Sequence, residues 1–169
     1  MPFTPFHFGP SAFVSLPLKR YIDIPIFILA NVAIDIEPLL VMTLDLAYPL
    51  HGFAHTFVGA AAVGVTIGIM ANFAKNHLEH IMRKILRLVY QSSKKKYILS
   101  GILGSWFHVL LDTTLYTDIK PFYPFTDLNP FLGLIQDSLM YKICAYAFIP
   151  AIAAYILIVI LEASKQKNL

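Results

Sequence analysis

Four long apolar runs constrain this chain more than any other feature of its sequence. They cover approximately residues 24–48, 53–74, 98–116 and 142–162. A helix needs about 20 mainly apolar residues to cross the hydrocarbon core of a bilayer, where only helices and closed barrels satisfy every backbone polar group. The chain is 57% hydrophobic and only 14% charged, whereas soluble domains carry about 25% charged residues. The sequence therefore predicts an all-α, polytopic membrane helix bundle with four spanning helices, which forms a single domain over residues 1–169.

Two further helices and one long loop complete the predicted architecture. The run 5–18 is too short to span easily and opens with a cap and a proline, so a short N-terminal helix is expected there. Segment 75–96 has apolar residues at helical spacing with basic residues opposite, which predicts an interfacial amphipathic helix. A metal site at its His77 and His80 is the alternative, but a solvated face is favoured. The aromatic-rich outer loop 117–141 is expected to provide interfacial anchors, with a lid that contacts lipid as the alternative.

The basic residues orient the predicted bundle. Eleven of the thirteen fall on one side, in the segment after the short helix, in 75–96 and at the C-terminus, and only Lys120 and Lys142 fall on the other. The positive-inside rule then predicts a multi-pass protein of the cell (inner or plasma) membrane. The basic loop and the C-terminus are expected to be cytoplasmic, and the N-terminus outside. This placement explains the net charge of +3 without a nucleic-acid partner.

Two smaller inferences concern targeting and redox chemistry. The first basic pair follows the first apolar stretch, whereas a secretory signal carries its charge before it, so no cleavable signal peptide is expected. A single cysteine, Cys144, excludes an intramolecular disulfide framework and lies within an apolar run. It is interpreted as a buried structural thiol.

Several ionisable residues lie inside the predicted spans, where a charge costs about 2.5–3.5 kcal/mol and usually marks function. Asp35 and Glu37 lie in the middle of the first run, and His108 and Asp112 lie well inside the third. With His7, His51 and His55, the chain has seven potential ligands. Under the predicted orientation, all seven lie in the outer half of the bilayer.

Spacing predicts how these side chains converge. The pairs His51/His55 and His108/Asp112 are each four residues apart, so each pair is expected to project from one helical face. Asp35 and Glu37 could not converge from a regular helix, but Pro38 disfavours helical geometry at Glu37. A kink or break is therefore expected there.

Imidazoles and carboxylates with almost no thiol suit zinc or another divalent transition metal rather than calcium. The predicted metal-binding residues are His7, Asp35, His51, His55, His108 and Asp112. They could bind one ion with outer partners, or two ions about 3.5–4 Å apart. Plainer interpretations remain, such as an interfacial His7 and a hydrogen-bonded His108/Asp112 pair that joins helices.

These residues resemble a known family, the bacterial and archaeal membrane-bound metal-dependent hydrolases, which are distantly similar to zinc-dependent phospholipase C. That family carries an early histidine, a D-x-D-x-P-like element, H-R-G-x-T-H, and H-x-x-x-D near a P-F element. The matching elements here are His7, "DIEP" (35–38), "HGFAHT" (51–56), "HVLLD" (108–112) and "YPF" (123–125). They extend from residue 7 to residue 125 and leave the last span unmatched.

The chain departs from the family pattern at four positions. Leu50 occupies the place of the first histidine of H-R-G-x-T-H, and His51 that of its arginine. Ala54 replaces the usual threonine, and Glu37 stands where aspartate is common. His55, Asp35, His108 and Asp112 carry over directly, whereas His51 could be a shifted ligand or a polar group that faces substrate.

The resemblance implies hydrolysis of a phosphoester in a lipid or another amphiphile. A metal-bound water has its pKa lowered toward ~7 and becomes a nucleophile at neutral pH. Glu37 is the favoured general base, with Asp35 the alternative and otherwise a ligand. Lys120 is a candidate contact for a substrate phosphate, although a plain interfacial lysine is the simpler interpretation.

Two other functions remain open at this point. Intramembrane carboxylates and histidines also occur in metal- or proton-coupled transporters, but no internal repeat is apparent. The third possibility is a non-catalytic scaffold in which a metal staples helices together. An exchangeable ligand position favours catalysis, and a closed set of four protein ligands favours the staple.

Overall fold

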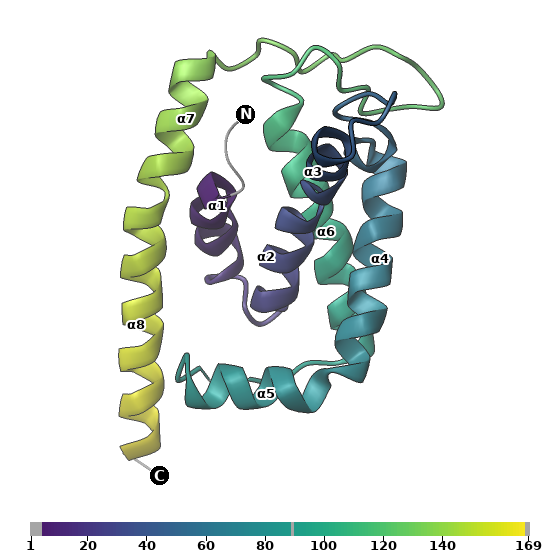
Figure 1. Ribbon diagram of the computed structural model, residues 1–169. Helices are drawn as coiled ribbons and strands as arrows, with labels where there is room; N and C mark the ends of the chain where they lie inside the picture. The colour runs from purple at the N-terminus through teal and green to yellow at the C-terminus, as the bar shows by residue number, and fades with distance from the viewer. Residues whose placement is uncertain (1–4, 89, 168–169) are drawn as a thin grey trace.

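The computed structural model describes residues 5–88 and 90–167 (Figure 1). Helices make up 66% of the protein and the described residues form no strand, so the all-α prediction is confirmed. The elements are α1 (Pro5–Ser15), α2 (Ile24–Ala33), α3 (Ile36–Thr43), the 3-10 turn η1 (Phe53–His55), α4 (Phe57–Phe73), α5 (Lys75–Lys84), α6 (Lys94–Asp112), α7 (Asp137–Tyr146) and α8 (Phe148–Lys167).

Two or three helical stretches in the described part of the chain are long and apolar enough to cross a membrane. Ile24–Thr43 and Asp137–Ser164 qualify alone, and α4 with α5 qualifies as a pair bent by 81°. The third predicted span does not qualify, because α6 begins with three lysines and ends at Asp112. The fifteen residues between Lys96 and Asp112 give about 22 Å of helix, less than the ~30 Å hydrocarbon core.

The first apolar run is broken, as predicted, but two residues earlier than expected. α2 ends at Ala33 and α3 begins at Ile36, so the break lies at Ile34–Asp35. Pro38 sits in the first turn of α3, where its missing N–H costs little, and its ring conflicts with a helical carbonyl four residues earlier, at Ile34. The break places Asp35 at the junction between two helices.

Glycines set the close approach of α4 and α6. A Cβ added to Gly64 would lie 2.4 Å from the Gly101 carbonyl oxygen, and one added to Gly101 would lie 2.1 Å from that of Gly64. Ser105 Oγ, one turn further along α6, donates a hydrogen bond to the Ala60 carbonyl at 2.7 Å. Small residues permit such backbone contact between helices in bilayers. This contact sets the position of α6, which carries His108 and Asp112, relative to α4.

A buried polar network ties the start of α2 to α6 and to the segment before it. The Tyr90 hydroxyl donates to Asp23 Oδ2 at 2.7 Å, and the Asp23 backbone N–H donates to Ser100 Oγ at 2.6 Å. Burial, together with the neighbouring Tyr97 and Asp23, raises the pKa of the Tyr90 hydroxyl well above its ordinary value. The hydroxyl therefore remains a donor to the carboxylate.

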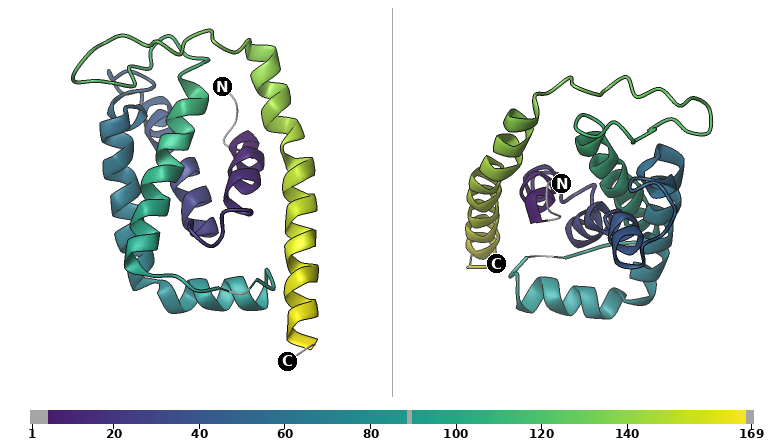
Figure 2. Two further views of the ribbon diagram at one scale, coloured as in Figure 1. Left: turned by 180° about the vertical axis from the view of Figure 1, so that it is seen from behind. Right: turned by 45° about the horizontal axis from the view of Figure 1, so that its top comes forward.

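Helix α5 lies across one end of the molecule, nearly perpendicular to α4 (Figures 1 and 2). It ends at Lys84, earlier than the amphipathic helix predicted over 75–96. Met82 is buried against the core beside Tyr97. The α1–α2 connection and the C-terminal end of α8 lie at the same end of the molecule, and the loop after α6 lies at the opposite end. The segments that carry eleven of the thirteen basic residues thus gather at one end.

Candidate metal site

Four side chains converge between the α2–α3 junction, η1 and α6. They are Asp35, His55, His108 and Asp112, and one ligand atom from each lies within 4.8 Å of the others. Three of the four are buried and Asp35 is partly exposed. This buried group of aspartates and histidines could bind a metal ion, as the sequence predicts in general terms; we call it the four-ligand group.

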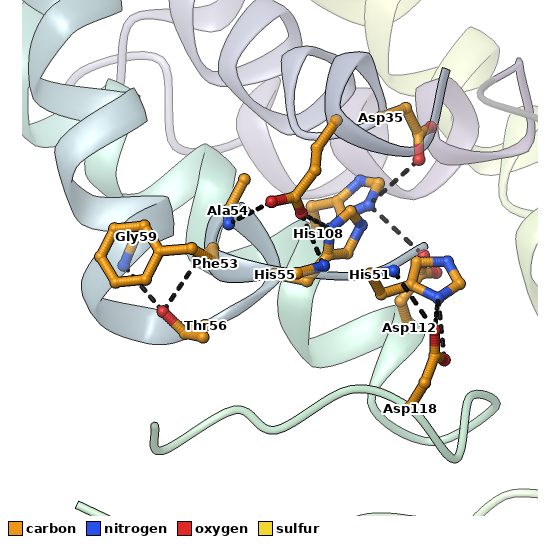
Figure 3. Close-up of polar contacts among 12 residues, drawn as sticks. Asp35, His51, Phe53, Ala54, His55, Thr56, Gly59, His108, Asp112 and Asp118 are labelled. Atoms are coloured by element: carbon orange, nitrogen blue, oxygen red, sulfur yellow. Dashed lines mark hydrogen bonds and ion pairs between the residues drawn. The ribbon is translucent and has the colours of Figure 1, made fainter. Parts of the chain in front are cut away.

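His108 lies at the centre of the four-ligand group (Figure 3). Its Nε2 atom is 3.4 Å from Asp35 Oδ1 and 3.4 Å from Asp112 Oδ2. His108 and Asp112 lie four residues apart in α6, on one face as their spacing predicts. Ligand atoms about 2.1 Å from a tetrahedral zinc ion are themselves about 3.4 Å apart. These two separations therefore match the edge of a zinc coordination tetrahedron.

Glu37 lies behind His55, outside the four-ligand group. His55 Nδ1 donates to Glu37 Oε2 at 2.8 Å, since an ionised carboxylate can only accept. Glu37 Oε2 also accepts from the Gly52 backbone N–H at 3.0 Å, and Oε1 accepts from that of Ala54 at 2.9 Å. A carboxylate in this position orients a metal-binding imidazole and increases its basicity.

Buried nitrogen atoms without partners support metal binding. His55 Nε2, His108 Nδ1 and His108 Nε2 are buried and have no hydrogen-bond partner among the described residues. Buried polar atoms are nearly always paired, so each exception calls for a physical reason. A cation beside His55 Nε2 and His108 Nε2 would satisfy both atoms, and the two aspartates would balance its charge. The residues present therefore fit a divalent transition metal.

His7 reaches the same place from α1. Its buried Nε2 donates to Asp112 Oδ1 at 3.2 Å, and its ring lies 4.4 Å from that of His108, centroid to centroid. It does not belong to the four-ligand group. Its Nδ1 is buried without a partner among the described residues. His7 thus contacts Asp112 Oδ1, whereas His108 lies near Oδ2, and one His7 nitrogen has no hydrogen-bond partner among the described residues.

His51 contacts His55 but lies outside the four-ligand group. Its ring centroid is 4.8 Å from that of His55, and its Nδ1 donates to Asp118 at 2.9 Å. The His51 backbone N–H donates to the same carboxylate at 3.2 Å (Figure 3). Sequence spacing did not single out Asp118, because it lies in the loop after α6, 67 residues from His51. Its one signal is an aspartate at the exit of a helix that carries two predicted ligands.

The predicted helical face for His51 and His55 is wrong. Helix α4 begins only at Phe57, because Thr56 caps it by accepting the Gly59 backbone N–H at 2.9 Å. His55 lies in the η1 turn, and His51 precedes it in the loop. Their rings approach each other because Glu37 and Asp118 hold them, rather than through helical periodicity.

Lys120 lies at the outer edge of this region. Its Nζ is 3.2 Å from Asp127, and both side chains are exposed. Lys120 lines a cavity of about 250 Å³ together with His51, Asp118 and Tyr123. Lys120 and His51 therefore line one cavity, whose lining includes no residue of the four-ligand group.

Access to the four-ligand group is uneven. The Asp35 side chain is 16% exposed, against 0% for His55 and His108 and 3% for Asp112. A small molecule therefore reaches the group most readily from the side of Asp35. A catalytic site needs an approach of this kind, whereas a purely structural metal does not.

Comparisons with protein-family models, curated proteins and solved structures found no match for this chain. The resemblance to membrane-bound metal-dependent hydrolases therefore stays a prediction based on sequence motifs. The function must be argued from the side chains themselves.

Proposed function

We propose that this protein is a membrane-embedded, metal-dependent hydrolase that cleaves a phosphoester of a lipid or another amphiphile. The observation that carries the proposal is the buried four-ligand group, with unpartnered imidazole nitrogens, at a break in an apolar helix. His55, His108 and Asp112 would hold one divalent transition metal, with zinc the best match to the ligands, and Asp35, the exposed member of the four-ligand group, would lie beside the open position. When bound, such an ion supplies Lewis acidity toward water and a phosphoryl oxygen.

Glu37 and Asp35, the two candidate general bases, have different surroundings. Three hydrogen bonds already occupy the Glu37 carboxylate, including the one from His55. Asp35 is the most accessible of the four ligands. We therefore assign proton acceptance from the attacking water to Asp35 and the orientation of His55 to Glu37. As water attacks phosphorus, the bond to the leaving oxygen breaks, and that oxygen takes up a proton from solvent at the opening.

The proposal includes a membrane topology. Helices α2–α3, α4, α6 and α7–α8 would provide four crossings, with the short α6 supported by its glycine contacts with α4. The end that carries α5 and most basic residues would face the cytoplasm. The N-terminus and the four-ligand group would lie toward the outer surface, where Lys120 could meet a substrate phosphate.

One observation favours a second candidate, a metal that only staples the helices. Four protein ligands can close a zinc site. Two buried histidines beyond those four argue for catalysis, because a staple would not require His7 beside Asp112 or His51 beside His55. The exposure of Asp35 argues in the same direction.

Metal content and hydrolysis measured together test the proposal. We expect near-stoichiometric zinc in the purified protein, its loss in His108→Ala, and its retention in His80→Ala, an exposed histidine on α5. We expect the zinc-loaded protein to release phosphate esters from phospholipid vesicles, and His108→Ala not to do so. Zinc that raises thermal stability without hydrolysis of any phosphoester would establish the staple. A wild-type protein that binds no added metal would overturn both candidates.

A further inference from the structure

We propose that one acyl chain of a membrane lipid occupies the groove between α3 and α4, with its polar end at Glu37. As an assignment of the substrate's apolar part, this rests on the proposed function. The groove has a volume of about 790 Å³. One wall includes Leu29, Ile36 and Leu40 from α2 and α3, and the other includes Ala62, Thr66 and Met70 from α4.

The walls of the groove are apolar and accessible. Ile36 is 54% exposed and Met70 is 64% exposed. The hydroxyl of Thr66 donates to the Ala62 carbonyl at 2.9 Å, so its hydrogen is used within α4. A surface of this kind lowers its free energy by contact with hydrocarbon. Apart from Thr66, Tyr48 and Glu37, no side chain that lines the groove is polar, so the groove suits an alkyl chain.

The groove reaches Glu37, which is one hydrogen bond away from the four-ligand group. Its lining includes Glu37 and Ala54, which are joined by the hydrogen bond from the Ala54 N–H to the carboxylate. Glu37 in turn holds His55 of the four-ligand group. The polar end of a bound lipid would therefore lie at Glu37, next to His55, while its chain runs along α4.

The length of the groove matches one leaflet of a bilayer. Gly59 and Met70 both line it and are eleven positions apart in α4, which gives about 16 Å along the helix axis. This is about half of a ~30 Å hydrocarbon core, the depth that a single acyl chain fills. The α2–α3 wall also belongs to a stretch apolar enough to cross a membrane.

A second apolar cavity provides a contrast. It has a volume of about 650 Å³ and lies against α1, α6, α7 and α8, with Phe13, Phe107 and Ile149 in its lining. Its lining contains neither Glu37 nor any residue of the four-ligand group. The lining of the α3–α4 groove also lacks the four ligands but does include Glu37, which holds His55, so we place the lipid chain in this groove.

The test fills the groove without disturbing the site. Ala62 is exposed on α4 and lines the groove, whereas Val58 is exposed on the same helix outside its lining. The probe is a phosphatidylcholine with a photoreactive diazirine in the middle of one acyl chain, presented to the protein in phosphatidylcholine vesicles. We expect labelling of α3 and α4 peptides in wild type, a fivefold or greater loss in Ala62→Trp, and no loss in Val58→Trp. Unchanged zinc content in both variants shows that the site is still folded.

The outcomes separate the groove from the proposed function. If labelling falls in Ala62→Trp but neither wild type nor any variant hydrolyses lipid, the result supports lipid binding in the groove and rejects the hydrolase. Hydrolysis in wild type with equal labelling of α3 and α4 in Ala62→Trp and Val58→Trp would support the hydrolase and overturn the groove. The same labelling in inactive His108→Ala as in wild type is also expected, because chain binding does not require the metal.

Discussion

The Glu37 carboxylate accepts a hydrogen bond from His55 Nδ1 at 2.8 Å, and this contact decides which nitrogen of His55 faces the four-ligand group. The same carboxylate is held by the backbone N–H groups of Gly52 and Ala54. His55 Nε2 is left buried without a partner in the described part of the chain. The Glu37 carboxylate thus leaves His55 Nε2 available to a cation. Its hydrogen bonds with Gly52 and Ala54 also hold the segment before α4 against α3.

Replacing Glu37 by Gln should weaken metal binding rather than abolish it. The amide is neutral and can accept only through its single oxygen, so one of the three donors loses its partner. Loss of such an outer carboxylate typically lowers metal affinity 10–100-fold. Competition with a chromophoric zinc chelator measures the change, and Glu79→Gln on α5 serves as the control. Equal zinc affinity in Glu37→Gln and wild type would show that Glu37 does not act through His55.

Replacing Asp118 by Asn should lower hydrolysis while leaving zinc content unchanged. Asp118 holds His51 through both the imidazole and the backbone N–H, and His51 lies outside the four-ligand group. We expect about a 10-fold fall in turnover at saturating lipid, by analogy with other outer partners of metal sites. Asp127→Asn, in the same loop but paired with Lys120, is the control. Loss of zinc in Asp118→Asn would instead make His51 a ligand.

Replacing Gly64 by Leu should separate α4 from α6 and cost stability. The first added carbon would already lie 2.4 Å from the Gly101 carbonyl oxygen, and backbone cannot move aside cheaply. Overpacking of this kind costs about 1–3 kcal/mol or more. The free energy of unfolding in mixed micelles measures it, and Thr66→Leu on the exposed face of α4 is the control. Zinc binding should fall as well in Gly64→Leu, since α6 carries two of the four ligands.

Replacing Tyr90 by Phe should remove the donor to the buried Asp23 carboxylate. A buried polar group that loses its partner costs about 1–3 kcal/mol. Tyr21→Phe, at an exposed tyrosine, should cost much less. The difference between wild type and Tyr90→Phe in the free energy of unfolding is the quantity to measure.

That difference should also depend on pH. The pKa of Tyr90 is raised in the folded protein, so its contribution is fully present below the ordinary tyrosine pKa of about 10. Above that pH the unfolded chain ionises first, and the wild-type advantage over Tyr90→Phe should shrink. An advantage that grows above pH 10 would contradict the raised pKa.

Features that depend on local residue spacing could be predicted from the sequence. Apolar runs of about twenty residues predicted helices, and their dominance excluded strands. Pro38 predicted the break in the first run to within two residues, because a proline acts on the carbonyl four residues before it. His108 and Asp112 lie on one face of α6 because helical geometry brings residues i and i+4 together.

Contacts between segments far apart in the chain could be identified only from the folded protein. Glu37 and His55 share a hydrogen bond although the loop 44–52 separates α3 from the η1 turn. Asp118, in the loop after α6, accepts a hydrogen bond from His51. The distinction between His55 in the four-ligand group and His51 outside it follows from these contacts. Residue spacing could not predict this distinction, because residues four apart share a face in an α-helix but not in the loop and turn that hold His51 and His55. The approach of α4 to α6 at Gly64 and Gly101 likewise depends on three-dimensional packing that no local pattern encodes.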